Sequence, residues 1–220
     1  MSDAGPSRLK SAWPAIVGLL AFAFAIVVLR TAWVSDDAFI TLRVVDNLVH
    51  GYGPRWNVAE RVQAFTHPLW FLLLLPTYVV TGLNGWLAAL LLGLATSGAG
   101  LVLLARRVAP RPAVAAVLLA IAVSSRALVD YSTAGLENPL GALFAFAGFL
   151  ALLRDDLDAE RRARAVAWCA GLAAFNRLDA LVLFAPALAW CGWSVGPRRM
   201  ARLSGAARSR RSAWGSTRAS

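Results

Sequence analysis

The sequence predicts an all-α protein, a polytopic transmembrane helical bundle of about six spans. Hydrophobic residues make up 59% of the chain, and its mean hydropathy of +0.61 is too high for an ordinary soluble domain. Long apolar runs recur along the chain, and the basic residues gather in short clusters between them. This distribution accounts for the net charge of +10 and excludes nucleic acid as a partner.

The expected spans cover most of the chain. The first runs over residues 13–34, with Arg30 at its outer end, where a long side chain reaches the interface. It is long and no small-residue cleavage site follows it, so we expect an uncleaved signal anchor. The other spans are expected at 85–105, 113–129, 139–153, 165–175 and 180–193.

Residues 68–80 form an apolar segment that is short for a span and contains Pro76. If it is re-entrant or interfacial, both chain ends are cytoplasmic and most of the 22 basic residues lie on the inner side. If it crosses, the basic cluster at 106–111 moves outside, which the positive-inside rule disfavours. We therefore expect a multi-pass protein of a bacterial-type inner (plasma) membrane, with residues 34–67 as an extracytoplasmic loop.

That loop opens with a predicted helix over residues 37–50. Its apolar residues share one side at helical spacing: Ile40, Val44, Val45, Leu48 and Val49. Its polar residues share the other side: Arg43, Asp46, Asn47 and His50. Ser35 fits the N-cap and Gly51 the position after the helix end. The pattern predicts a juxtamembrane amphipathic helix lying on the membrane surface.

Adjacent carboxylates, Asp36 and Asp37, begin this helix. They fit the positive end of the helix dipole, so capping alone can explain them. Neighbouring carboxylates also repel each other. One can then hold a raised pKa and pass protons, or both can face a cation or an acceptor hydroxyl. The residues alone leave these alternatives open.

Three further stretches carry polar residues at span ends. NVAER, residues 57–61, ends in a charged pair that also suits an ordinary surface turn, and HPLW follows it at 67–70. In STAGLENPLG, residues 132–141, Gly135 permits a tight turn and Glu137 begins a span, where it could be a simple helix-end charge.

The third stretch is AAFNRLDALVLF, in which Arg177 and Asp179 interrupt apolar sequence. Charges inside a span are costly, and positions i and i+2 do not face each other on a helix. We therefore expect these two residues in a break between helices. An ion pair that merely stabilises the break is the structural alternative.

Together these stretches resemble the GT-C superfamily of polytopic membrane glycosyltransferases, closest to the terminal arabinofuranosyltransferases of mycobacterial type and their bacterial relatives. The resemblance covers residues 34–180 and implies a GT-C-like transmembrane module over residues 1–195. It implies that Asp36 and Asp37 are catalytic, and it implies these substrate-binding residues: Arg43, Asn57, Glu60, Arg61, His67, Glu137, Arg177 and Asp179. Ala59 stands where the family has Gly, Gln63 where relatives carry an acid, and Leu178 where they have Pro.

The activity that this resemblance implies is inverting sugar transfer, of arabinofuranose or mannose, from a polyprenyl-phosphate donor to an envelope glycan or lipid acceptor. The motif favours Asp36 as the base, with Asp37 orienting the acceptor or a divalent cation; no metal ligand set is assigned. Arg177 would meet the lipid phosphate, because a guanidinium fork suits phosphate oxygens. Family members are longer than this chain, so the resemblance leaves two alternatives open, a membrane glycosyltransferase or its truncated N-terminal half.

Two other functions stay open. A non-catalytic membrane module could bind a polyprenyl lipid or a partner protein. A small transporter is the weakest candidate, because the span centres carry few polar residues. Cys169 and Cys191 lie in apolar runs and are expected to be inert. The Arg/Ser-rich residues 196–220 are expected to form a disordered cytoplasmic tail that can touch anionic lipid.

Overall fold

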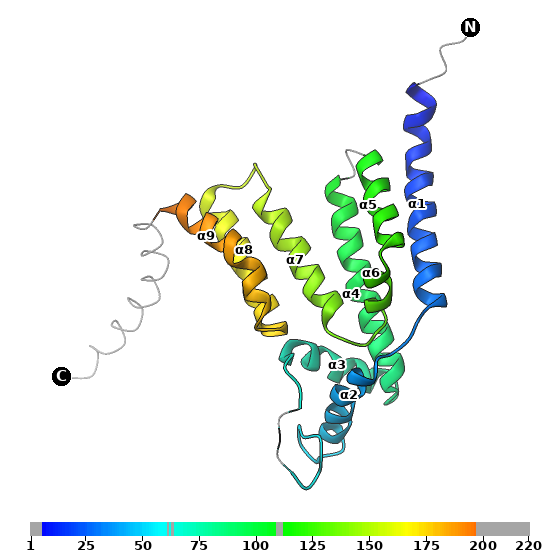
Figure 1. Ribbon diagram of the computed structural model, residues 1–220, viewed down its shortest axis with the longest axis vertical. Coiled ribbons are helices and arrows are strands. Elements are labelled where there is room, and N and C mark those ends of the chain that lie inside the picture. The colour runs from blue at the N-terminus through cyan, green and yellow to red at the C-terminus, as the bar shows by residue number, and fades with distance from the viewer. Residues whose placement is uncertain (1–5, 61, 63, 109–111, 197–220) are drawn as a thin grey trace, which may run out of the picture.

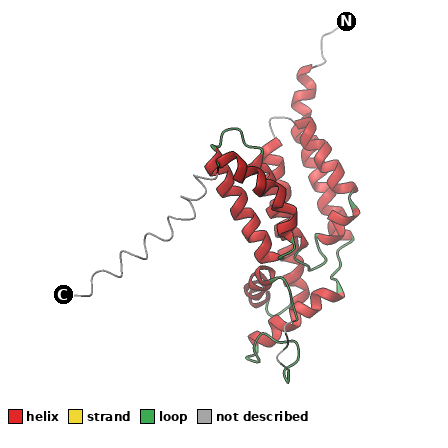
Figure 2. Cartoon of the chain, turned by 60° about the vertical axis from the view of Figure 1, so that its left-hand side comes forward, coloured by secondary structure: helices red, strands yellow, loops and turns green. Residues whose placement is uncertain are grey.

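The computed structural model describes residues 6–60, 62, 64–108 and 112–196. Within these residues the regular structure is entirely helical, with no strand (Figure 2). The all-α class predicted from the sequence is therefore confirmed. The predicted tail lies outside the described residues, apart from Gly196.

The helices form a bundle that is closed at one end by two further helices. Helices α1, α4, α5, α7, α8 and α9 run along the length of the molecule, while α2 and α3 lie at the lower end, with α3 across it (Figure 1). The bounds are α1 (Pro6–Arg30), α2 (Asp36–Val49), α3 (Pro68–Val80), α4 (Gly85–Val108), α5 (Pro112–Ser124), α6 (Arg126–Tyr131), α7 (Asn138–Leu152), α8 (Ala159–Asn176) and α9 (Ala180–Val195).

Local sequence explains most of these bounds. Pro68 and Pro139 lie in the first turns of α3 and α7, where the missing N–H of proline is harmless. Asp158 begins α8, because its side chain accepts a hydrogen bond of 2.7 Å from the Arg161 N–H. Gly51, with φ of +83°, follows the end of α2, as predicted.

Two of the expected spans differ from the helices of the structure. The span expected at 113–129 is two helices, α5 and α6, because Ser125 is extended and its Oγ accepts a hydrogen bond from the Leu128 N–H at 3.4 Å. The span expected at 165–175 lies within α8, which begins earlier, at Ala159, because Asp158 caps the helix there. The first helix ends at Arg30, short of residue 34.

Membrane-spanning length is reached by one segment of the described chain. Gly85–Ala105, within α4, is by length and composition able to cross a bilayer. The other apolar helices are shorter: Gly18–Arg30, Pro68–Val80, Ala113–Ser124, Asn138–Leu152 and Ala180–Val195. The six-span arrangement therefore stays a prediction.

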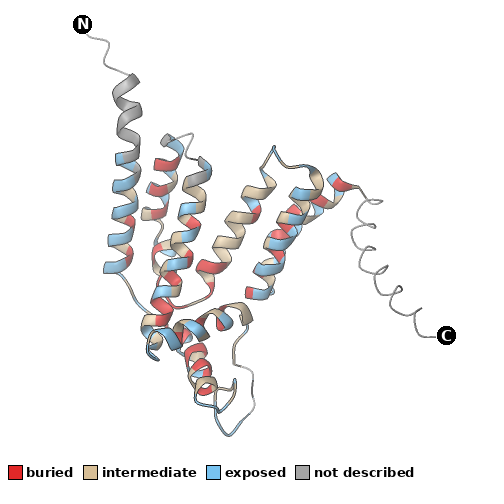
Figure 3. Ribbon diagram, turned by 180° about the vertical axis from the view of Figure 1, so that it is seen from behind, coloured by how far each residue is buried: buried red, intermediate tan, exposed pale blue. Residues whose placement is uncertain are grey.

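The largest core cluster joins α2, α3, α4 and α7 and holds the lower end together. Val44, Trp70, Leu74 and Ala88 are fully buried in it. Figure 3 shows buried residues gathered on these helices, while the coloured part of α1 is largely exposed. Helix α2 is thus packed against the bundle on its apolar side.

One residue of α2 differs from the prediction. Asn47, expected on the polar outer side, is buried. Its Nδ2 donates to the carbonyl oxygens of Arg55 at 2.8 Å and Trp56 at 3.0 Å. A buried amide needs such partners, so Asn47 holds the 50–60 loop against the helix.

Candidate functional site

A polar pocket of about 350 Å³ opens at the lower end of the bundle. Four separate parts of the chain line it: α2, the approach to α3, the α6–α7 connection and the break after α8. The charged or titratable side chains in its lining are Asp37, His67, Tyr131, Glu137 and Arg177. Residues more than a hundred positions apart therefore share one cavity.

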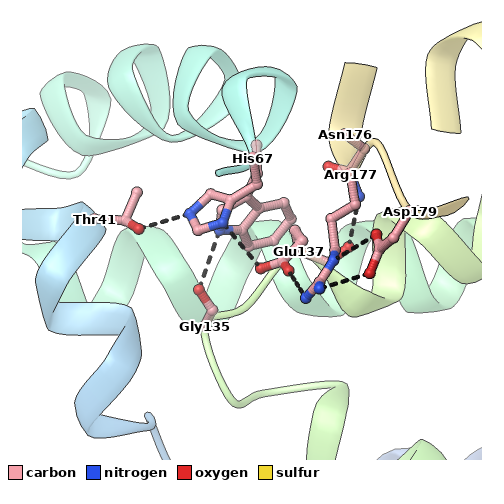
Figure 4. A network of polar contacts seen from close by, with 8 residues as sticks. Thr41, His67, Gly135, Glu137, Asn176, Arg177 and Asp179 are labelled. Atoms are coloured by element: carbon pink, nitrogen blue, oxygen red, sulfur yellow. Dashed lines mark hydrogen bonds and ion pairs between the residues drawn. The ribbon is translucent and has the colours of Figure 1, made fainter. Parts of the chain in front are cut away.

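Glu137 is the centre of the site. Its side chain is only 5% exposed, and both carboxylate oxygens have partners. Oε1 accepts from Arg177 Nη1 at 2.9 Å, and Oε2 lies 3.4 Å from His67 Nδ1 (Figure 4). Burying a carboxylate without partners would cost several kcal/mol. The His67 and Arg177 contacts make this burial tolerable.

His67 lies between Glu137 and Thr41. Its Nε2 is 2.7 Å from the Thr41 Oγ1. Burial lowers the pKa of His67 below 6.5; the Glu137 carboxylate opposes this shift and the Arg177 guanidinium adds to it. The imidazole is therefore neutral at pH 7. If the ring proton is on Nδ1, facing Glu137, then Nε2 accepts a hydrogen bond from the Thr41 hydroxyl.

Arg177 joins two carboxylates. Its Nε and Nη2 donate to the two oxygens of Asp179 at 3.0 and 2.8 Å, and its Nη1 donates to Glu137 (Figure 4). Both residues lie in the break between α8 and α9, the position that their sequence pattern indicates. The pairing lowers the pKa of Asp179 and raises that of Arg177.

Backbone contacts fix the turn that presents Glu137. Gly135 has φ of +77°, as the tight-turn prediction requires, and its carbonyl accepts from the Trp70 Nε1 at 3.1 Å. A Cβ at this position would lie 2.9 Å from the Ala38 Cβ. The Ser35 N–H donates to the Ala134 carbonyl at 2.9 Å. The start of α2 is thereby tied to the Glu137 turn.

The two adjacent acids lie in different environments. Asp37 lines the polar pocket. Asp36 Oδ1 instead accepts from the Asp37 N–H at 3.0 Å and from the Ser35 hydroxyl at 3.2 Å. Asp36 thus contacts the start of α2 through one carboxylate oxygen, whereas Asp37 borders the pocket, and both side chains are exposed. Ser35 occupies the N-cap position but makes no side-chain cap bond.

The pocket lining does not include Arg43, Asn57 or Glu60. Arg43 faces a different pocket beside Trp56. Asn57 and Glu60 are exposed and joined by a backbone hydrogen bond of 3.2 Å, while Arg61 lies outside the described residues, as does Gln63. Ala59 is not among the described residues with positive φ, so Ala is unstrained there.

Sequence reasoning missed three residues of the site: Thr41, Trp70 and Asn176. Thr41 lies in an apolar run, and no local signal indicates its contact with His67. Trp70 is part of the HPLW motif. Asn176, which donates to the Glu137 carbonyl at 3.0 Å, could have been found as an amide in apolar sequence beside Arg177.

A metal centre of the usual kind is not apparent in the described part of the chain. No three of its His, Cys, Asp and Glu residues cluster so as to hold a metal ion. The charge of Glu137 is offset by Arg177 instead. The site's chemistry, as far as these residues define it, is that of carboxylates, an imidazole and a guanidinium.

Similarity to curated proteins agrees with the motifs. The chain is 35% identical over 139 residues, 54% of its length, to the terminal β-(1→2)-arabinofuranosyltransferase of Mycobacterium tuberculosis. It is 46% identical over 63 residues, 26% of its length, to the protein of the same name from Corynebacterium glutamicum. The matches span only 20% and 9% of these relatives. No protein-family model and no solved structure matches the chain.

The predicted resemblance is thus confirmed as partial similarity. The chain is similar, over about half of its length, to terminal β-(1→2)-arabinofuranosyltransferases of two bacteria.

Proposed function

We propose that the chain is a membrane glycosyltransferase, or the part of one that carries its acidic site, of the GT-C inverting type. It transfers arabinofuranose or mannose from a polyprenyl-phosphate donor to a hydroxyl of an envelope glycan or lipid. The observation that carries this proposal is the convergence of Asp37, His67, Glu137 and Arg177 on one polar pocket. The names of the two relatives supply the reaction class.

The chemistry follows from the environment of each side chain. Asp37 takes the proton of the acceptor hydroxyl, whose oxygen attacks C1 of the sugar. The bond between C1 and the phosphate oxygen breaks, the lipid phosphate leaves with the electron pair, and C1 is inverted. Two N–H groups of the Arg177 guanidinium have no partner among the described residues, and these can donate hydrogen bonds to the phosphate oxygens. The motif favours Asp36 as the base, but the lining of the pocket favours Asp37.

Apolar space beside the site fits a lipid tail. A cavity of about 280 Å³ lies among α4, α5, α6 and α7, with Leu119 and Phe146 in its lining. A neighbouring pocket of about 290 Å³ shares Leu128 with this cavity, and shares Tyr131 and Asn138 with the polar pocket. An isoprenoid chain could follow this series of pockets away from a phosphate at Arg177.

The surface supports a membrane location. Large apolar side chains are exposed on the outer faces of the helices, among them Phe22, Trp168 and Trp193, the last 87% exposed. Such surface suits lipid better than water. The last turn of α4, the first turn of α5 and the α7–α8 connection lie at the end of the bundle opposite to α2 and α3 (Figure 1), and arginines are frequent in these parts of the sequence. We therefore propose that the pocket is extracytoplasmic and α3 interfacial, the arrangement that the positive-inside rule favours.

The test uses membranes that contain the full chain, with a radiolabelled polyprenyl-phosphate sugar and an acceptor glycan. Asp37→Asn should lower transfer at least 100-fold, within the range of a lost general base. Asp36→Asn should lower it less, because that side chain is not part of the pocket lining. Asp155→Asn, an exposed acid in the α7–α8 connection, is the matched control. Full activity of the Asp37 variant would remove this residue from the mechanism.

One alternative is a module that binds the polyprenyl lipid without catalysis, since Arg177 and the apolar pockets beside it would serve binding alone. A photoreactive polyprenyl phosphate separates the two. Labelling of the wild-type chain that Arg177→Gln abolishes, in membranes that show no transfer, would establish the binding module and refute the enzyme.

A further inference from the structure

A second pocket lies on the other side of α2. It has a volume of about 590 Å³ and is lined from α2, the loop before α3, α3 and the start of α4. Asp37 and Thr41 of α2 face the polar pocket, whereas Phe39, Arg43 and Asp46 line this one. One helix therefore separates two cavities of different composition. We call the second one the α2–α4 pocket.

Its polar groups are held in place but retain free capacity. Arg43 Nε donates to the Trp56 carbonyl at 3.1 Å, and its guanidinium carbon lies 4.8 Å from the centre of the Trp56 ring. Asp46 Oδ1 accepts from the Tyr78 hydroxyl at 2.6 Å. Among the described residues, the two Nη atoms of Arg43 and the Oδ2 of Asp46 have no partner.

Aromatic side chains supply the apolar part of the lining. Phe39 is 50% exposed and Trp86 is 47% exposed, although both line the pocket. The start of α4 packs against α2 at Gly85, where a Cβ would lie 3.4 Å from the Leu42 side chain. Trp86 is thereby brought to the pocket edge, with part of its indole open to a ligand.

We propose that the α2–α4 pocket binds a neutral oligosaccharide. A sugar ring has an apolar C–H surface, which suits an exposed aromatic face, and a rim of hydroxyls, which suits fixed charged donors and acceptors. Asp46 beside Arg43 offsets the positive charge, so the pocket does not favour a phosphate. That the bound oligosaccharide is the acceptor glycan rests on the proposed function. That the pocket binds a sugar does not.

A different role for these aromatics is anchoring at the membrane interface, where Trp is common. Anchoring would not depend on Arg43 or Asp46. The two roles therefore differ in one measurable respect: only sugar binding is lost when the charged residues of the α2–α4 pocket are replaced.

The test measures binding by the full chain in lipid nanodiscs, with calorimetry and two probes, an arabinofuranosyl and a mannosyl tetrasaccharide. At least one probe should bind, and Trp86→Ala and Arg43→Ala should each weaken binding at least 10-fold. The matched controls are Trp193→Ala and Arg126→Ala, at exposed positions on α9 and α6. Asp46→Asn, a nearly isosteric change, repeats the test if either alanine variant fails to fold.

Each result is decisive. Failure of both probes to bind the wild type would overturn the proposal, as would unchanged affinity in the pocket variants. Retained binding without any sugar transfer by the wild type would refute only the proposed reaction, and transfer without binding would refute only this pocket.

Discussion

Replacement of Arg177 by Gln should destabilise the protein through Glu137. The glutamate side chain is 5% exposed, and the change removes its 2.9 Å hydrogen bond to Nη1. A buried group left without its partner costs about 1–3 kcal/mol, and more when it is charged. Breaking a fully buried ion pair costs about 3–5 kcal/mol. Because the Arg177 side chain is 45% exposed, we expect Arg177→Gln to lower the free energy of unfolding by about 1–3 kcal/mol.

Thermal unfolding in detergent, followed by circular dichroism, measures this effect. For a chain of this size, 1 kcal/mol corresponds to a shift of about 2–4 °C in the midpoint, so Arg177→Gln should lower the midpoint by at least that amount. Asp179→Asn is the control, because its partner is the same guanidinium but its side chain is 65% exposed. Solvent screens an exposed pair, so Asp179→Asn should lower the midpoint much less than Arg177→Gln.

A double variant tests the physical reason. Glu137→Gln removes the charge that Arg177 neutralises, so Arg177→Gln combined with Glu137→Gln should be more stable than Arg177→Gln alone. The reasoning is refuted if the two single changes simply add, or if Arg177→Gln is no more harmful than Asp179→Asn. Glu137 would then be stabilised by something other than the guanidinium.

Three further changes should alter stability in ways that the same melting experiment detects. Gly135→Ala places a side chain at a residue whose φ is +77°, with its Cβ 2.9 Å from the Ala38 Cβ, and should cost about 1–3 kcal/mol of stability. The control Gly98→Ala, whose Cβ meets no atom within 4 Å, should be neutral or stabilising. Equal effects of the two changes would contradict the packing argument. Leu178→Pro should stabilise the protein by about 0.4–1 kcal/mol. The Ala180 N–H donates to the Arg177 carbonyl at 3.0 Å and closes a turn in which residue 178 takes the second position, and this position favours Pro. A lower midpoint would show that the turn has another form. The pKa of His67 in the folded protein is below its unfolded value of 6.5. The stability that neutral His67 contributes is therefore present above pH 6.5 and is lost as the pH falls below that value, because the unfolded chain then binds more protons. His67→Gln should flatten the decline in midpoint between pH 7 and 5, and an unchanged slope would assign the decline to other groups.

Much of the lower end of the bundle was predictable because its signals are local. Pro68 and Pro139 mark helix starts, Gly51 and Gly135 mark positive φ, and the charge of Arg177 marks a helix break. Each of these effects acts within a few residues, so one sequence suffices to find it.

The contacts that build the site were not predictable in the same way. Thr41 and His67 are 26 positions apart, and Glu137 and Arg177 are 40 apart. Whether Asp36 or Asp37 faces the pocket depends on about 100° of rotation about α2, which the packing of Val44 and Val45 determines. The sequence over 113–129 looked like one continuous helix, because a single serine in an apolar run has little weight in a periodicity argument. In the structure Ser125 caps a new helix, α6, at this point.

The fork of Arg177 has a consequence for whatever ligand arrives. A free arginine side chain samples many rotamers, and fixing it costs about 2 kcal/mol of entropy. Here Asp179 and Glu137 immobilise the guanidinium during folding. An incoming anion therefore meets a rigid receptor, and discrimination between anions would rest on shape rather than on the flexibility of the host.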